Sequence, residues 1–208
     1  MKNRILNELN NYFPKPKCEL VYSTNFELLV SVILSAQCTD KRVNLVTKEL
    51  FKKANTPYDF ASMEIEELEN QIHSCGFYRA KAKAIKEASK EIIEKFNGEV
   101  PSNFDDLCSL RGVGRKTTNV MISEAFKGDA FAVDTHVLRV SNRLGIAETE
   151  NPDKCEMVLK KYFDQKDWSR LHYQMVLFGR YKCKARNPEC EGCALKDNCK
   201  YFKNKMSK

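Results

Sequence analysis

The sequence lacks an apolar run long enough to cross a bilayer. The longest such run lies around Leu28 to Ala36 and is interrupted by Ser31 and Ser35, whereas a transmembrane helix needs about 20 mostly apolar residues. The first residues, MKNRILNELNNYF, mix apolar and polar side chains as an amphipathic helix does, and they show no signal-peptide cleavage pattern. These absences argue against membrane and secreted proteins, so we expect a soluble cytoplasmic protein with no membrane partner.

Strand patterns are also almost absent, whereas apolar residues recur at helical spacing along the chain. We therefore predict an all-α fold of roughly ten short helices with short linkers. Thr39, Ser102 and Asp134 stand where a side chain can cap the first turn of a helix. The predicted helices cover about residues 1–13, 25–37, 40–54, 64–73, 78–96, 102–110, 116–126, 135–145, 152–163 and 168–181.

Positive and negative charges nearly balance along most of the chain, and only the C-terminal end carries a clear excess of one sign. The formal net charge is +7, and residues 179–208 hold nine Lys/Arg against three Asp/Glu, a net of +6. The remaining 26 Lys/Arg and 25 Asp/Glu nearly cancel. A basic tail on a neutral body indicates a polyanionic partner, of which nucleic acid is the commonest, although a solvated lysine-rich end would give the same pattern.

The nine cysteines form two populations. Five are scattered along the chain and are typical of buried small apolar residues; they are Cys18, Cys38, Cys75, Cys108 and Cys155. The other four follow a C-x6-C-x2-C-x5-C spacing within seventeen residues: Cys183, Cys190, Cys193 and Cys199. Without a secretion signal, this spacing predicts a metal site rather than disulfides.

The spacing of the four clustered cysteines favours iron and sulfur over zinc without excluding zinc. Structural zinc sites usually contain two C-x2-C pairs, and only one is present here, whereas a [4Fe–4S] cluster needs four separated thiolates. Lys182, Lys184 and Arg186 flank these cysteines. We expect the folded loop to present these cations outward.

Only eight glycines occur in the chain, yet two of them flank one valine in LRGVGRKTTNV, residues 110–120. A nucleotide-binding P-loop is excluded, because Arg115 separates Gly114 from Lys116. The pattern instead predicts a tight turn between helices, in which the backbone N–H groups around Gly112, Val113, Gly114 and Arg115 bind a phosphate without reading sequence. This is the helix-hairpin-helix pattern, and an ordinary turn between two helices is the alternative.

Several motifs together resemble the endonuclease III family, the iron–sulfur DNA glycosylase/AP lyases of the helix-hairpin-helix glycosylase superfamily. The resemblance runs the length of the chain and rests on LSAQCTD, GFYRAKA, LRGVGRKTTNV, AVDTHVLRVSNRL and the cysteine loop. It implies that Lys116 and Asp134, eighteen positions apart, are the catalytic lysine and aspartate. It also implies a [4Fe–4S] cluster.

The chemistry of such an enzyme requires these two residue types. Breaking a glycosidic bond gives the sugar oxocarbenium character, which a carboxylate such as Asp134 stabilises. An amine such as Lys116 can attack C1′, displace the base and form a Schiff base from which the 3′ phosphate is eliminated. The amine must be unprotonated, and the neighbouring cation Arg115 disfavours a second positive charge. The alternatives are that Lys116 only contacts a phosphate and that Asp134 only caps a helix. We expect His136 to orient another group or to pack, and not to catalyse.

The resemblance further implies that Gln37 fills the gap left by a flipped nucleotide and that Phe77 lies in a loop that wedges into the base stack. The simpler alternatives are that Gln37 only ends its helix and that Phe77 is an aromatic residue of the core. Two positions depart from the family pattern. Arg111 stands where proline is usual, which bears on the rigidity of the hairpin, and Phe77 stands where leucine is usual, which bears on the wedge.

The resemblance implies two helical domains with a DNA cleft between them: a six-helix domain at residues 20–128, and an iron–sulfur domain of residues 1–19 and 129–208. We expect a monomer, associated with the nucleoid, that acts in base excision repair on double-stranded DNA with oxidised or saturated pyrimidines or abasic sites. One alternative is the adenine glycosylase of the same superfamily, which Lys116 and the lack of a further domain after Lys208 argue against. The other is a non-catalytic DNA-binding module with structural zinc.

Overall fold

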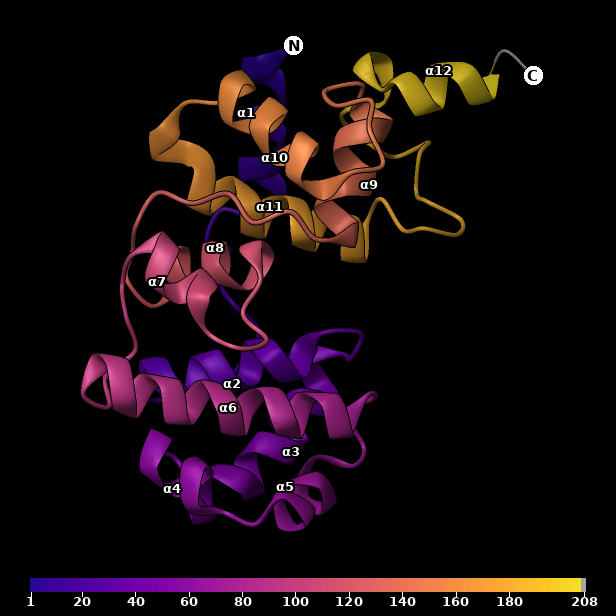
Figure 1. Cartoon of the computed structure of the whole chain (residues 1–208). Coiled ribbons are helices and arrows are strands. Elements are labelled where there is room, and N and C mark those ends of the chain that lie inside the picture. The colour runs from indigo at the N-terminus through magenta and orange to yellow at the C-terminus, as the bar shows by residue number, and fades with distance from the viewer. Residues whose placement is uncertain (207–208) are drawn as a thin grey trace. The chain divides into compact units, whose positions relative to one another are not determined.

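The computed structural model describes residues 1–206, and within that range all regular secondary structure is helical, with no strand (Figure 1). The predicted all-α class is confirmed. Twelve α-helices and two short 3₁₀ helices lie in the described residues. Four of these elements are additions to the ten helices predicted from sequence: α4 (Pro57–Ser62), the last α-helix, α12 (Lys200–Met206), and the two 3₁₀ helices, η1 (Gln165–Asp167) and η2 (Lys196–Asn198).

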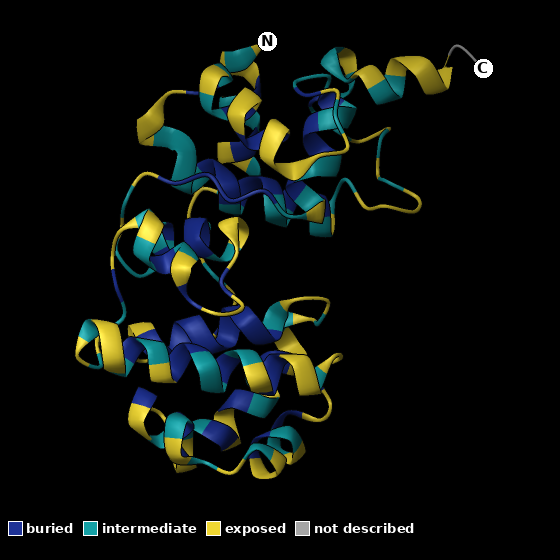
Figure 2. Ribbon diagram, viewed as in Figure 1, coloured by how far each residue is buried: buried dark blue, intermediate teal, exposed yellow. Residues whose placement is uncertain are grey.

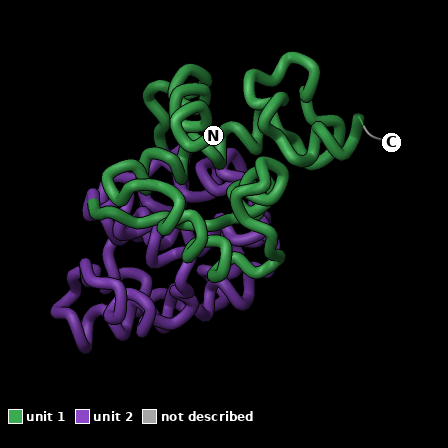
Figure 3. Tube along the Cα trace, turned by 90° about the horizontal axis from the view of Figure 1, so that it is seen from above, with its two compact units in different colours: residues 1–17, 128–208 green, residues 18–127 purple. Residues whose placement is uncertain are grey.

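The chain divides into two compact units, coloured separately in Figure 3. Unit 1 contains residues 1–17 and 128–208, and unit 2 contains residues 18–127. The predicted domain boundaries, at 19/20 and 128/129, lie close to these divisions.

Unit 2 is built around one strongly apolar helix. Its helices are α2 (Asn25–Ser35), α3 (Asp40–Lys53), α4 (Pro57–Ser62), α5 (Ile65–Ile72), α6 (Tyr78–Phe96), α7 (Phe104–Ser109) and α8 (Arg115–Glu124). Helix α2 is buried from Phe26 to Leu34 (Figure 2) and packs against α3, α6 and α8. Burial of each large aliphatic side chain contributes about 1.5–3 kcal/mol, so this helix holds unit 2 together.

Unit 2 contains seven helices in place of the six predicted, because α4 was missed. Thr56 caps this helix in a capping box with Asp59, and Pro57 occupies its first turn. Its six residues are too few for an apolar period to be visible, but the Thr-Pro-x-Asp order is a local start signal. A second difference concerns α7, which is capped by the Asn103 side chain rather than by Ser102.

Unit 1 joins the N-terminal helix to the C-terminal part of the chain. It comprises α1 (Lys2–Tyr12), α9 (Thr135–Leu144), α10 (Pro152–Tyr162), α11 (Trp168–Tyr181) and α12, together with η1 and η2. Helix α11 packs against both α1 and α9. The buried Gln174 of α11 donates to the Phe13 carbonyl at 2.9 Å, and Arg4 of α1 binds the Ala194 carbonyl at 3.0 Å. The first helix thereby supports the loop that contains the four clustered cysteines.

Candidate functional site

The turn between α7 and α8 needs its first glycine for packing. Gly112 has φ +75°, and a Cβ placed on it would lie 2.5 Å from the Cβ of Ala84 on α6. Any side chain here would combine a left-handed backbone with a steric clash. Val113, the next residue, is buried, and its N–H donates to the Leu110 carbonyl at 3.1 Å. The turn is therefore pressed closely against α6.

The second glycine has no such explanation inside the protein. Gly114 is the N-cap of α8 with φ −91°, a value that any residue adopts, and apart from its two chain neighbours no residue of the described chain has an atom within 4 Å of a Cβ built on it. It is followed by the first turn of α8, whose backbone N–H groups have no acceptor within the helix itself. The arrangement leaves open space directly before the first turn of α8, where an anion can approach the backbone.

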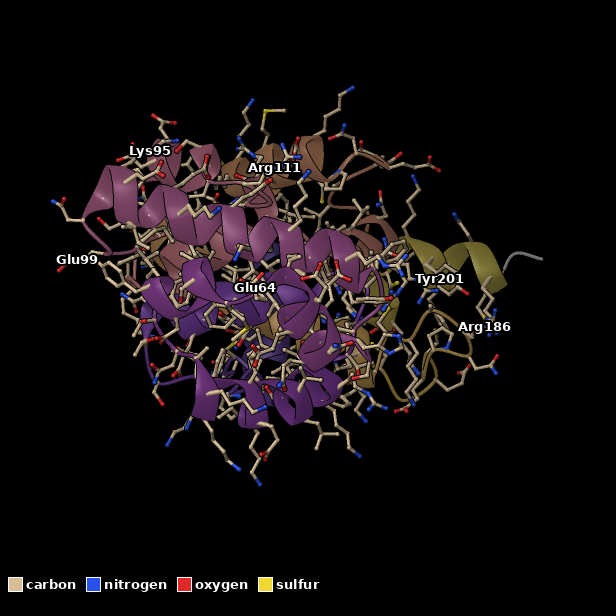
Figure 4. The ribbon with its side chains drawn as sticks, turned by 60° about the horizontal axis from the view of Figure 1, so that its bottom comes forward. Glu64, Lys95, Glu99, Arg111, Arg186 and Tyr201 are labelled. Atoms are coloured by element: carbon tan, nitrogen blue, oxygen red, sulfur yellow. The ribbon has the colours of Figure 1, made fainter. Side chains whose placement is uncertain are left out.

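Arg111 fastens the same turn to α6, which answers how a hairpin without the usual proline is held. The side chain of Arg111 is labelled in Figure 4. Its Nε lies 3.1 Å from Oε2 of Glu87, and its backbone N–H donates to Oε2 of Glu91 at 2.7 Å. The salt bridge is exposed and worth little alone. The bond from the backbone to Glu91, one helical turn further along α6, fixes the position of the loop itself.

Lys116 lies in the first turn of α8 with its side chain exposed. The neighbouring Arg115 places its guanidinium 5.3 Å from the centre of the Phe104 ring on α7. Arg115 therefore packs partly against the helix that precedes the turn. The amine of Lys116 is accessible to a partner that approaches the turn.

Asp134 caps α9 with one oxygen only. Its Oδ1 accepts from the backbone N–H groups of His136 and Val137 at 2.9 and 2.8 Å, which confirms the predicted capping role. Among the described residues of its unit, Oδ2 accepts no hydrogen bond, and the side chain is half-buried. One carboxylate oxygen is thus fixed by the helix and the other is left for a different task.

His136 and Arg139 connect the start of α9 to the cysteine loop. Arg139 Nη2 lies 3.2 Å from Nδ1 of His136 and donates to the Gly179 carbonyl at 2.7 Å, while its Nε donates to the Cys183 carbonyl at 3.2 Å. Burial lowers the pKa of the Arg139 guanidinium, whereas the nearby charge of Asp134 acts in the opposite direction. His136 thus contacts Arg139, and its expected role of orienting or packing stays a prediction.

The cysteine loop surrounds one cavity. All four clustered cysteines line it, and it contains roughly 400 Å³ of empty space, part of which is open to solvent. All four are free thiols. No three His, Cys, Asp or Glu side chains in residues 1–206 form a group that could hold a single metal ion. The four sulfurs are therefore arranged around a space rather than gathered at a point.

Arg143 holds this loop from α9. It donates to the carbonyls of Lys184 and Ala185 at 2.7 and 3.0 Å and lies 3.4 Å from Sγ of Cys183. Its guanidinium also stacks 4.4 Å from the ring centre of Tyr201, on α12; Tyr201 is labelled in Figure 4. Neither Arg139 nor Arg143 is among the residues predicted from sequence, although their four-residue separation puts them on one helix face.

The three cations of the loop differ in their surroundings. Lys182 and Lys184 both pair with Glu189, at 3.1 and 2.8 Å, and these pairs hold the pKa of the Glu189 carboxyl below its usual value. Arg186 is exposed on the loop (Figure 4). The expectation that all three cations simply point outward is therefore incomplete, because two of them share one carboxylate.

Gln37 and Phe77 lie in two neighbouring loops of unit 2, and both have left-handed backbones, with φ of 53° and 58°. Both are exposed, Phe77 by 67% of its surface. A Cβ built on Gly76 would lie 3.9 Å from the Gln37 carbonyl oxygen, so the two loops run side by side. Exposed apolar surface and left-handed backbone at non-glycine residues are both uncommon, and such strain is concentrated at binding sites.

Comparison with known proteins gives the class of protein to which this fold and these residues belong. Residues 30–165 match the sequence model described as "HhH-GPD superfamily base excision DNA repair protein". Endonuclease III of Bacillus subtilis (strain 168) is 50% identical over 196 residues, which are 94% of this chain and 90% of that protein.

Solved structures agree. A non-covalent endonuclease III–DNA complex superposes with a TM-score of 0.96 at 48% identity, covering 100% of this chain and 99% of that one. A trapped endonuclease III–DNA covalent intermediate gives 0.95 at 48% identity, covering 99% of both chains. The chain therefore belongs to the endonuclease III family of base excision repair proteins, whose activity is that of a DNA glycosylase and lyase. No helix within residues 1–206 is both long and apolar enough to span a membrane.

Proposed function

We propose that this protein removes oxidised or saturated pyrimidines from double-stranded DNA and then cleaves the abasic site through a Schiff base on Lys116. The observation that supports this most strongly is the unequal use of the two hairpin glycines. Gly112 is required by its contact with Ala84, whereas nothing in the described chain requires a glycine at position 114. A glycine without a neighbour, directly before an exposed lysine, fits a backbone that must approach a DNA phosphate.

The reaction divides between two side chains. Asp134, with Oδ1 engaged by the helix, offers Oδ2 to the positive charge that develops on the sugar as the glycosidic bond breaks. The Lys116 amine attacks C1′, the base leaves, and loss of a proton from C2′ then expels the 3′ phosphate. Because Lys116 is exposed in the protein alone, the water around its amine is displaced only when DNA covers the turn.

The loops at Gln37 and Phe77 stabilise the duplex while the damaged base is out of the stack. A duplex base is reached only after it leaves the stack, which costs a few kcal/mol. An exposed aromatic side chain can replace the lost stacking, and an amide can bond to an unpaired base. We propose that Phe77 enters the stack and that Gln37 occupies the space of the flipped nucleotide.

The two hairpin glycines give a prediction with a built-in control. Gly114→Ala should keep the free energy of unfolding within about 1 kcal/mol, because alanine is only the poorer N-cap, yet lower the affinity for duplex DNA on the order of tenfold. Gly112→Ala should instead destabilise the protein by about 2 kcal/mol or more, through left-handed strain and the clash with Ala84. Urea unfolding and DNA binding at fixed salt measure the two effects. If the Gly114→Ala variant binds DNA with normal affinity, the proposed phosphate contact at this turn is wrong.

We further propose that the cysteine loop holds a [4Fe–4S] cluster. The sulfurs of Cys183, Cys190, Cys193 and Cys199 surround a cavity and do not form a single-ion site, which suits a polynuclear centre better than one zinc ion. When bound, the cluster supplies four metal–thiolate bonds that close the loop. Arg143 then fixes the loop carbonyls, and the basic side chains Lys182, Lys184 and Arg186 can face the DNA backbone.

The cluster prediction is tested by Cys193→Ser. Loss of one thiolate should abolish the visible absorption of the purified protein and weaken DNA binding, because the loop loses its closure. The matched control is Cys155→Ser in the same unit, whose thiol is fully buried and lies outside the loop. If the Cys193→Ser variant and the wild type show equal visible absorption, Cys193 is not a ligand. If the wild-type protein is colourless and contains zinc, the site binds zinc and not a [4Fe–4S] cluster.

Within the superfamily, Lys116 is also the residue that favours this function over that of an adenine glycosylase. We propose that the protein acts as a monomer and works at the nucleoid.

A further inference from the structure

Two of the five scattered cysteines lie together, contrary to the expectation that each is a separate buried apolar residue. The thiols of Cys38 and Cys75 are neighbours, and neither cysteine is in a disulfide. Cys75 is fully buried, whereas Cys38 is half-buried. The pair therefore has one member that a small reagent can reach from solvent.

The surroundings of the pair hold its two segments side by side. The Gln37 carbonyl oxygen lies 3.9 Å from a Cβ built on Gly76, so the residues next to the two cysteines are already in contact distance. Lys81, itself buried, donates from Nζ to the Leu34 carbonyl at 2.8 Å, and its charge acts on both thiols. Arg42 adds a second cation near Cys75. Both cations act to lower the pKa of the Cys75 thiol, against the larger effect of its burial.

We propose that Cys38 and Cys75 are a redox modification site, at which exchange with a small-molecule disulfide joins the two loops through a reversible disulfide. The Cys38 thiolate attacks one sulfur of the small disulfide, forms a mixed disulfide and releases one thiol. Cys75 then gives up its proton and attacks the Cys38 sulfur, and the second small thiol leaves. Two protein thiols are oxidised and one small disulfide is reduced, so atoms and electrons balance.

The exposure of the two residues sets the order of these steps. Burial, with a contribution from neighbouring Cys38, raises the pKa of the Cys75 thiol to about 11. Cys75 is thus a poor first nucleophile and is out of reach of the reagent. Once Cys38 carries the mixed disulfide, the adjacent Cys75 is the thiol positioned to complete the bond.

The disulfide has a consequence for DNA, and this part rests on the proposed function. Cys38 directly follows Gln37, and Cys75 lies two residues before Phe77. A covalent bond between the loops would stop them from moving independently, as entry into a base stack requires. We expect oxidised protein to bind a duplex with an uncleavable abasic analogue on the order of tenfold more weakly, with recovery after reduction.

The test uses the complete protein with its metal centre, treated with oxidised glutathione while the visible absorption is followed. Free thiols are then alkylated, the protein is digested with trypsin, and linked peptides are sequenced by tandem mass spectrometry. Sequencing is necessary because no Lys or Arg separates Cys18 from Cys38, so both lie in one tryptic peptide. Wild type should give a Cys38–Cys75 link. Cys75→Ser should stop at a glutathione adduct on Cys38.

Cys108→Ser is the matched control, because Cys108 is a half-buried cysteine of the same unit whose thiol lies 3.1 Å from the Thr118 hydroxyl. It should form the link as wild type does. Absence of the link in both wild type and this control would overturn the modification site. A link without any change in DNA affinity would overturn its effect on the loops. Failure of the reduced protein to bind DNA, with the link present, would count against the proposed function and leave the modification site supported.

Discussion

Replacement of Lys116 by glutamine or by arginine is expected to abolish the covalent protein–DNA adduct that borohydride traps during turnover. The trapped species is a reduced imine between an amine and C1′ of the sugar, which neither an amide nor a guanidinium can form. Because Lys116 is exposed, both changes should alter the free energy of unfolding by less than about 0.5 kcal/mol. Because folding should be unaffected, loss of the adduct in these variants would show that the side chain of Lys116 takes part in the reaction.

The arginine variant carries the sharper part of this test. If Lys116 only neutralised a phosphate, arginine would serve as well or better, since it presents more donors to the same anion. If Lys116 is the nucleophile, the Lys116→Arg variant should bind the duplex but form no covalent adduct. Lys52→Gln is the control, because Lys52 is an exposed lysine of the same unit that pairs only with Glu49 on its own helix; it should trap as wild type does. A normal adduct yield from Lys116→Arg would assign the chemistry to another amine.

The sequence predicted those parts of the site that depend on local pattern. Asp134 precedes a helix and caps it, as its position indicates. Helix α2 is buried along its length because nearly every residue in it is apolar. The helix-hairpin-helix turn follows from two glycines before a helix. In each case, neighbours within a few residues determine the result.

Features that depend on distant contacts could not be predicted in this way. Nothing near Gly112 reveals that Ala84, nearly thirty residues earlier, fills the space of its missing Cβ. The bonds from Arg139 to Gly179 and Cys183 likewise join segments about forty residues apart. The missed helix α4 is a different case: its capping signals were local, but six residues are too few to show a period.

The strained loops lie beyond sequence prediction for a physical reason. Gln37 and Phe77 adopt left-handed backbones that their own conformational preferences disfavour. Only the surrounding fold can impose such a conformation, so a local reading of the sequence expects a helix end and a core aromatic instead. The resemblance to a family named these two positions, and the structure supplies the exposed, left-handed geometry.

Asp134→Asn is expected to lower single-turnover base excision by at least roughly two orders of magnitude while leaving the fold nearly unchanged. The amide oxygen of asparagine can accept from the His136 and Val137 N–H groups as Oδ1 of the aspartate does. Asparagine and aspartate are about equally good N-caps. The substitution therefore removes the negative charge and the second carboxylate oxygen and retains the cap.

Two further variants separate capping from catalysis. Asp134→Ser also caps a helix and has no carboxylate, so its activity should fall as far as that of the asparagine variant with stability retained. Asp134→Ala loses the cap as well and should cost about 0.5–2 kcal/mol of stability in addition. Thermal unfolding measured beside single-turnover excision gives the comparison. If activity follows stability across the three variants, Asp134 serves only the helix; if all three are equally inactive while only alanine is destabilised, the carboxylate acts on the sugar.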